Sequence, residues 1–206
     1  IEEHKFLIGE LDSWILGIVE NGWDRVSRKA QAEGVTAIRE HILERLTGIG
    51  AKEQHVSVGF SSVERELQSS SDPASWGSEE LRTMSSAIRK SMFPISVAAN
   101  KADNMEELGS ELESEVESNG GTVVFTSAEA ELALRRASSS GLISYRLGDS
   151  EFELTAAGEE NLTEKQRAAL SSISSTLSSW DGGGLVGLLS EVVFGQLSRI
   201  VAYPVQ

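Results

Sequence analysis

The hydrophobic pattern of this 206-residue chain changes at Phe93, and this change constrains the fold more than any other feature of the sequence. Before Phe93, apolar residues recur every three or four positions, as they do along the buried face of an amphipathic helix. After it, short apolar runs of strand length alternate with helical segments. The sequence therefore predicts a helical domain over residues 1–92 and an α/β domain over residues 93–206.

Three apolar stripes with helical spacing define the N-terminal domain. They comprise Phe6, Leu7, Leu11, Trp14, Ile15, Ile18, Val19 and Trp23; then Ile38, Ile42, Leu43 and Leu46; then Leu81, Met84, Ile88 and Met92. Two glycines in "TGIGAKE" predict the end of the second helix. The serine-rich stretch 68–75 predicts a loop, after which Ser78 is expected to cap the third helix.

The C-terminal domain is predicted to contain a parallel sheet. Strands are expected at 95–99 and 122–126, joined by the acidic helix 105–118, with short pairing between 143 and 154. Helices are expected at 129–140, from Thr163 to Trp180, and up to Ile200. Because a crossover helix joins parallel strands, functional loops are expected at their carboxyl ends.

Composition excludes several classes of function. The chain carries 32 acidic and 18 basic side chains, a net charge of −14, which opposes binding to DNA or other nucleic acids unless Lys and Arg gather on one face. It has no cysteine, which removes disulfides and thiolate chemistry, and its three histidines lack metal-ligand spacing. The longest apolar stretch, "GLVGLLSEVVFGQL", is too short and interrupted to span a bilayer, so we expect no membrane partner and a cytoplasmic location.

A polar cluster ends the first predicted strand, which we expect to be buried. Asn100 and Lys101 follow "ISVAA" directly, and Asp103 comes just beyond Ala102. A carboxylate at Asp103 can accept hydrogen bonds from the ring N–H and the exocyclic amine of guanine, a pair that adenine does not offer. Asn100 can hold the other edge of the purine or tie neighbouring loops together, and the stem of Lys101 can cover a face of the base.

A second candidate loop ends the next predicted strand. Ser127 and Ala128 follow "TVVFT", and a small residue there lets a backbone N–H approach the guanine carbonyl. The sequence thus predicts a guanine-binding site made from five residues of two loops.

These motifs resemble a known family. "PISVAANKAD" resembles the Asn-Lys-x-Asp specificity motif of P-loop GTPases, and "FTSAEAE" resembles their later Ser-Ala motif. Longer stretches, including "IEEHKFLIGELDSWILGIVENGWDRVSRKAQ" and "VVFGQLSRIVAYPV", look like the archaeal branch of the YchF/Obg-type translation-associated GTPases. The resemblance implies GTP or GDP as ligand, an α-helical insertion at 1–92 ahead of the C-terminal half of the GTPase core, and a link to the ribosome or to translation factors.

The phosphate-binding half of such a GTPase is missing from these 206 residues. The sequence contains no G-x-x-x-x-G-K-[ST] and no D-x-x-G followed by a switch segment, the groups that hold phosphates and Mg²⁺. Because Ile1 begins in the middle of a helical pattern, we expect a fragment of a longer GTPase, inactive by itself and able to self-associate through its incomplete sheet. The alternative is a helical module that binds protein or RNA and keeps a vestigial nucleotide site.

Four other features have simpler interpretations. "LTGIG" resembles the hairpin of DNA-binding helix-hairpin-helix modules, but we favour the interpretation that it is a glycine turn that ends a helix. Trp14, Trp23, Trp76 and Trp180 are expected in the core. Arg135 with Arg136, and the acidic row of Glu107, Glu111 and Glu115, are expected on solvated helix faces.

Overall fold

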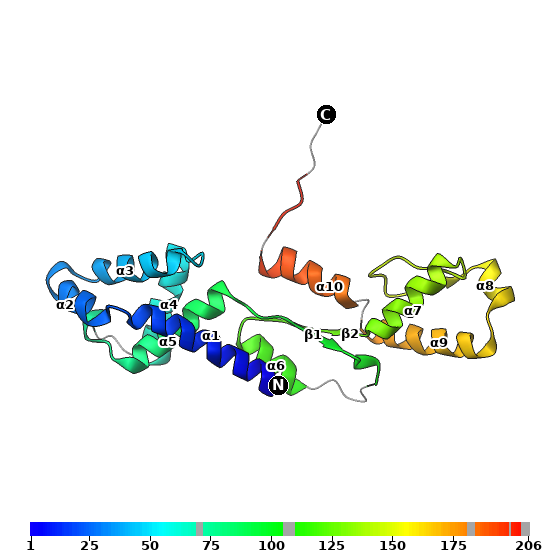
Figure 1. The fold of residues 1–206 in the computed structure, drawn as a ribbon, viewed down its shortest axis with the longest axis horizontal. Helices are drawn as coiled ribbons and strands as arrows, with labels where there is room; N and C mark the ends of the chain where they lie inside the picture. Colours follow the sequence, from blue (N-terminus) through cyan, green and yellow to red (C-terminus); the bar gives the residue numbers. More distant parts are fainter. Residues whose placement is uncertain (69–71, 105–109, 181–183, 198, 203–206) are drawn as a thin grey trace. The chain divides into compact units, whose positions relative to one another are not determined.

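A computed structural model describes residues 1–68, 72–104, 110–180, 184–197 and 199–202, and Figure 1 shows its ribbon. The chain divides into two compact units, Ile1–Pro94 and Ile95–Gln206, which we call unit 1 and unit 2. That unit 1 corresponds to an insertion within a GTPase domain remains a prediction.

Unit 1 is helical throughout its described part. It contains α1 (Glu2–Glu20), α2 (Trp23–Glu33), α3 (Thr36–Thr47), α4 (Glu53–Glu66) and α5 (Ser78–Met92), with a 3₁₀ turn at Pro73–Ser75. No strand occurs among the described residues of this unit, which confirms the prediction made from the helical period.

The core of unit 1 draws on all five helices. Seven of its fully buried members belong to the three predicted stripes: Ile15, Val19, Ile38, Ile42, Leu46, Met84 and Ile88. Val63 of α4, a helix for which no stripe was predicted, is also fully buried. Trp23 and Trp76 are also buried, and the Trp76 ring lies 4.9 Å from that of Phe60.

The stripe predicted for α1 is partly wrong. Phe6, Leu7 and Trp14 are exposed, at 70%, 45% and 48% of their surface. Apolar residues occur all around α1, whereas only one face of a helix can meet its neighbours, here α3 and α5. Trp14 is therefore not the core anchor that we predicted.

The ends of two helices differ in how well the sequence predicted them. At the end of α3, the Gly50 N–H donates to the Thr47 carbonyl and the Ala51 N–H to the Leu46 carbonyl. This pattern is the Schellman motif, which confirms the helix-ending interpretation of "LTGIG". The cap of α5 is Gly77 rather than Ser78, because the Glu80 carboxylate accepts the Gly77 N–H at 2.9 Å.

Two tight contacts hold α5 in place. A Cβ at Gly59 of α4 would lie only 2.8–2.9 Å from side-chain atoms of Ile88 and Met84, so the glycine lets α4 and α5 approach closely. The Arg89 side chain is fully buried, and its Nε lies 2.8 Å from Oδ1 of Asp12 on α1. Ser86 donates to the other oxygen of the same carboxylate.

Unit 2 alternates strands and helices, as predicted. Its elements are β1 (Val97–Asn100), a 3₁₀ turn (Ala102–Asn104), α6 (Ser110–Ser118), β2 (Val123–Thr126), α7 (Ala128–Ser139), β3 (Ile143–Ser144), β4 (Glu153–Leu154), α8 (Ala156–Asn161), α9 (Glu164–Ser179) and α10 (Gly184–Ser190). A π-helical turn, Glu191–Gln196, follows α10, so the last helix ends before the predicted Ile200. The first part of the predicted acidic helix, 105–109, lies outside the described residues.

Both predicted strand pairs form. β1 and β2 run parallel, with Val97 opposite Val123 and Asn100 opposite Thr126, and β3 pairs with β4 in the antiparallel sense. Unit 2 is thus a helix-rich α/β unit with a small parallel sheet. A Cβ at Gly121, just before β2, would lie 1.8 Å from the Ile95 carbonyl oxygen, so the approach to this sheet requires glycine.

The expectation that the first strand is buried is wrong. Along β1, Ala98 and Asn100 are exposed and Val97 and Ala99 are only partly buried. The reason is that β2 is the single partner of β1 among the described residues, and a two-stranded sheet has little surface with which to bury its strands.

A second, smaller core lies elsewhere in unit 2. Leu134 of α7, Ile143 of β3, and Leu162, Leu170 and Leu177 around α9 form this cluster. The capping box predicted at the start of α9 is present, since the Thr163 N–H donates to Gln166 Oε1 at 2.9 Å. None of the helices that the structure describes has the length and apolar character needed to cross a bilayer.

Candidate functional site

The two predicted loops leave the same edge of the parallel sheet. Because Asn100 is opposite Thr126, β1 and β2 end side by side, and the residues that follow each strand are neighbours in space. The loop after β1 carries Lys101 and Asp103, and the loop after β2 carries Ser127 and Ala128. The structure therefore brings together the loops of all five predicted site residues.

Asn100 connects the two loops directly. Its Oδ1 accepts a hydrogen bond from the Ala128 N–H at 3.0 Å. This is one of the two roles considered for Asn100 from the sequence, while its contact with a purine stays a prediction. The Ala128 N–H is engaged in this arrangement, so a bond from it to a base carbonyl requires either a shared hydrogen bond or a rotated Asn100 side chain.

Lys101 has an unusual backbone. Its φ of +65° lies in the left-handed region, where a residue with a Cβ is disfavoured by about 1–2 kcal/mol. Ala102 beside it is buried and anchors the turn, while the Lys101 side chain is exposed. Such local strain is typical of binding loops and turns the chain sharply at the end of β1.

Asp103 lies in the 3₁₀ turn Ala102–Asn104, and its side chain is exposed. The carboxylate at this position can act only as a hydrogen-bond acceptor when it is ionised, with several lone pairs directed to solvent. No group of carboxylates and histidines suited to a metal ion occurs among the described residues.

Ser127 has a structural role that the sequence reasoning missed. It is buried, and its Oγ accepts the Ala130 N–H at 3.2 Å, which caps the N-terminus of α7. The signal was present in the sequence, because a serine before a first turn with Glu129 and Glu131 is a typical helix start. This cap fixes the backbone from which Ala128 donates to Asn100.

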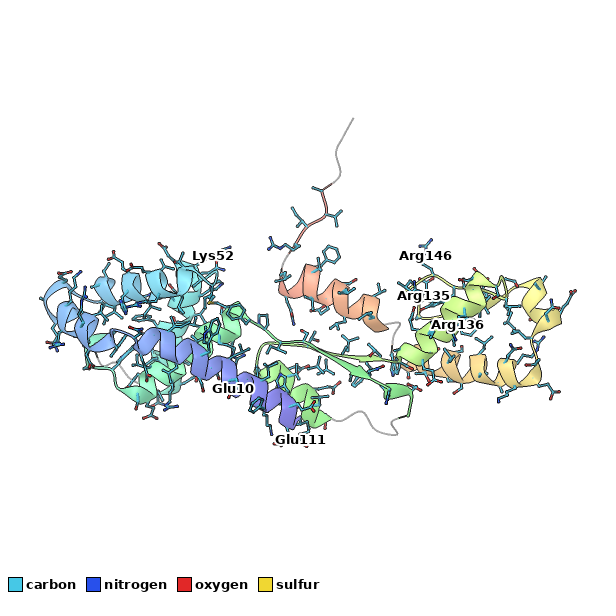
Figure 2. All side chains as sticks on the ribbon, in the orientation of Figure 1. Glu10, Lys52, Glu111, Arg135, Arg136 and Arg146 are labelled. Carbon is cyan, nitrogen blue, oxygen red and sulfur yellow. The ribbon has the colours of Figure 1, made fainter. Side chains whose placement is uncertain are left out.

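A hydrogen bond from Tyr145 also holds α7, the helix that follows the second loop. The Tyr145 hydroxyl donates to Glu131 Oε2 at 2.9 Å, and burial, together with this bond, raises the pKa of Tyr145 to about 12. On the outer side of the same helix, Arg135 and Arg136 are exposed, as predicted, and Figure 2 shows them labelled on α7. Glu111 is likewise exposed on α6, whereas Glu107 lies outside the described residues.

The C-terminal half of the chain matches a known protein family. Residues 98–206, just over half of the chain, match the model of the "Obg-like GTPase YGR210-like, G4 motif-containing domain". The chain belongs to this family of Obg-like GTPases. The matched region contains both loops of the candidate site, although the match does not assign a role to any single residue.

A relative matches over the whole length of this chain. The chain is 32% identical over 212 residues to an "uncharacterized GTP-binding protein" of the archaeon Methanocaldococcus jannaschii. The alignment covers 100% of this chain and 49% of the relative, so the chain spans about half the length of that protein. No solved structure matches the chain. Homology to GTP-binding proteins is thus established for the whole chain, and family membership for its C-terminal half.

Proposed function

We propose that unit 2 of this chain is the base-recognition part of a GTP-binding protein of the YchF/Obg type. The observation that carries the proposal is the pairing of two loops at the carboxyl edge of a parallel sheet, joined by the bond from the Ala128 N–H to Asn100 Oδ1. Ligands of open α/β sheets bind at this edge. The family match supports a guanine nucleotide as the ligand.

In the proposed site, Asp103 accepts the ring N–H and the amine of guanine. The turn with positive φ at Lys101 brings the Lys101 stem over one face of the base, while Asn100 ties this loop to Ala128 in the loop after β2. A site built on such donors and acceptors rejects an analogue that lacks them by about four to five orders of magnitude. Guanine specificity thus rests on Asp103.

The proposed activity of the whole protein is GTP hydrolysis with Mg²⁺, linked to translation, as in the family that the sequence resembles. The 206 residues contain no phosphate-binding loop motif, so phosphoryl transfer would depend on residues outside this sequence. The half-exposed β1 is consistent with a sheet that pairs with further strands or with a second copy of the chain.

The test is replacement of Asp103 by Asn. An amide donates to the carbonyl that xanthine has in place of the guanine amine. The variant should therefore bind xanthosine diphosphate (XDP) in preference to GDP. We would measure GDP, XDP and ADP by saturation-transfer NMR with the 206-residue chain, for which we expect affinities of roughly millimolar order because only the base is held. The same titrations should be repeated with a protein as long as the full-length relative.

The matched control is Glu111→Gln, which removes an exposed carboxylate from α6 and should leave base preference unchanged. A D103N variant that still prefers GDP over XDP to the extent of the parent would refute the role of Asp103.

A further inference from the structure

Unit 1 carries two adjacent cavities that share Arg45. One, of about 490 Å³, lies between α1 and α3 and is lined by Trp14, Gly17 and Asn21 as well as by Arg45. The other, of about 500 Å³, lies between α2 and α3 and begins at Gly22. The two cavities therefore meet where the chain passes from α1 to α2. Each has a volume typical of small-ligand sites.

Trp14 provides an accessible aromatic face in the first cavity. Its side chain is 48% exposed, although a tryptophan is usually well buried. Gly17 is on the same face of α1, one turn away, and a Cβ there would have no heavy atom within 4 Å, so the floor beside the indole is open. An exposed indole that lines the same cavity as the Arg45 guanidinium offers a surface on which a nucleic-acid base can stack.

The second cavity is lined by three cations, Arg25, Lys29 and Arg45. Among the residues that the structure describes, neither Arg25 nor Arg45 forms an ion pair, whereas Lys29 pairs with Glu33 on the solvent side of α2. Unpaired guanidinium groups retain all their donors for an external anion, and their fork geometry suits phosphate.

The anionic groups of this cavity are fewer than its cations. Glu40 and Glu44 of α3 also line it, so the five charged side chains together carry a net charge of +1. The surrounding unit is also less acidic than the chain as a whole. Unit 1 has eleven Lys and Arg against fifteen Asp and Glu, whereas unit 2 has seven against seventeen. Long-range repulsion of a phosphate is therefore weakest at unit 1.

His41 adds a polar group to the wall of the second cavity. Burial, and then the nearby Arg45, lower its pKa, and its ring also hydrogen-bonds to the Asn21 backbone. Its Nε2 is buried without a hydrogen-bond partner among the described residues. The bond to Asn21 therefore involves Nδ1, which leaves the buried Nε2 as an unsatisfied polar atom in the wall of this cavity. A Cβ at Gly22 would lie 3.4 Å from both the His41 ring and Arg45 Nη2, so glycine keeps these groups close to the backbone.

We propose that the two cavities bind one nucleoside phosphate unit, with its base against Trp14 and its phosphate beside Arg45 in the cationic cavity. This site is separate from the guanine loops of unit 2 and does not depend on them. The same chemistry is offered by a free nucleotide and by one unit of a single-stranded RNA, and the test separates these two sources.

The experiment titrates the whole chain with an eight-residue oligouridylate, with UMP and with inorganic phosphate at low salt, followed by calorimetry and tryptophan fluorescence. Uridine probes avoid the guanine site. Trp14→Leu should weaken oligonucleotide binding roughly 5- to 150-fold, the range for loss of one stacked base, while Trp14→Tyr should retain most of the affinity. Arg45→Gln should weaken oligonucleotide binding roughly tenfold or more. It should also reduce the slope of log affinity against log salt concentration by about one.

Arg65→Gln is the matched control, because this arginine on α4 is 71% exposed, pairs with Glu66 and lines neither cavity. It should bind as the parent does. A UMP affinity equal to that of the octamer indicates a free-nucleotide site, and octamer binding that exceeds it indicates RNA; both support the proposal. An NMR titration should also show that phosphate raises the pKa of His41.

Two results would overturn the proposal. One is the absence of binding by all three probes at millimolar concentration, which would leave the cavities open to a protein partner instead. The other is that Trp14→Leu and Arg45→Gln bind the oligonucleotide with the same affinity as the control Arg65→Gln. Neither result affects the guanine-site test, since that test uses Asp103 and purine ligands.

Discussion

Unit 1 and unit 2 bury their apolar side chains to different extents. In unit 1 a single core joins all five helices, with members such as Ile15, Ile42 and Ile88 fully buried. In unit 2 the main cluster is smaller, and α10 and the turn after it leave Leu185, Leu189 and Phe194 more than half exposed. Helices can pack on neighbours that are close in sequence, whereas a parallel strand needs partners from distant segments.

This difference predicts separate responses to mutation in the two units. Substitutions in the closed core of unit 1 should lower the stability of that unit strongly. Substitutions in unit 2 should act mainly on the strand edge and the loops. The following predictions test this contrast, from the largest expected effect to the smallest.

Asp12→Ala should destabilise unit 1 by about 3–5 kcal/mol, because it removes a carboxylate that pairs with the fully buried guanidinium of Arg89. The value should fall toward the lower end, since the Asp12 side chain is itself 29% exposed. Urea unfolding followed by circular dichroism measures it. Glu66→Ala is the control, because its pair with Arg65 is exposed and should contribute less than about 1 kcal/mol. Equal effects of the two variants would contradict the assigned role of Asp12.

Gly121→Ala should destabilise unit 2 by about 2–3 kcal/mol, because its methyl group would overlap the Ile95 carbonyl oxygen and force the entry to β2 away from β1. Backbone amide exchange in 97–100 and 123–126 would show the loss of pairing. The control Gly187→Ala adds a methyl group where no heavy atom lies within 4 Å, and its stability should be unchanged or higher. Unchanged amide protection in Gly121→Ala would show that the strands tolerate the shift.

Asn100→Ala should cost about 1 kcal/mol, the typical value for one hydrogen bond, through loss of the acceptor for the Ala128 N–H. The specific readout is faster hydrogen exchange at the Ala128 amide, with little change in unit 1. Asn100→Asp retains an acceptor oxygen and should keep the amide protected. If both variants exchange at the parent rate, Asn100 does not join the loops in solution.

Tyr145→Phe should cost about 1 kcal/mol or less at neutral pH by removing the hydroxyl that donates to Glu131. The folded-state pKa of about 12 is above the ordinary value of 10, so the folded state holds this proton more tightly. The contribution should therefore be complete below about pH 10 and disappear between about pH 10 and 12. The parent should lose its stability advantage over the variant across that range, and a parent that is still the more stable of the two at pH 12 would contradict the assignment.

The sequence predicted element types well and some individual contacts poorly. The two parallel strands, the separate short pair β3–β4 and the all-helical character of unit 1 followed from the hydrophobic period, because burial on one face imposes that period directly. The exposure of Trp14 and the partial exposure of β1 did not follow, since period indicates which face is apolar but not whether a neighbour covers it. The cap at Gly77 was also missed, because Ser78 offered the more usual capping side chain.

By itself the sequence determined that two polar loops would follow two adjacent parallel strands, and hence that Asn100, Lys101, Asp103, Ser127 and Ala128 belong to one edge of a sheet. Only the tertiary structure decided how they are used. It placed Oδ1 of Asn100 3.0 Å from the Ala128 N–H, gave Lys101 a positive φ, and turned Ser127 inward as a helix cap. Spacing along a chain specifies which backbone segments become neighbours, but hydrogen bonds of 3 Å depend on side-chain rotamers and loop dihedrals that are set by packing across the sheet.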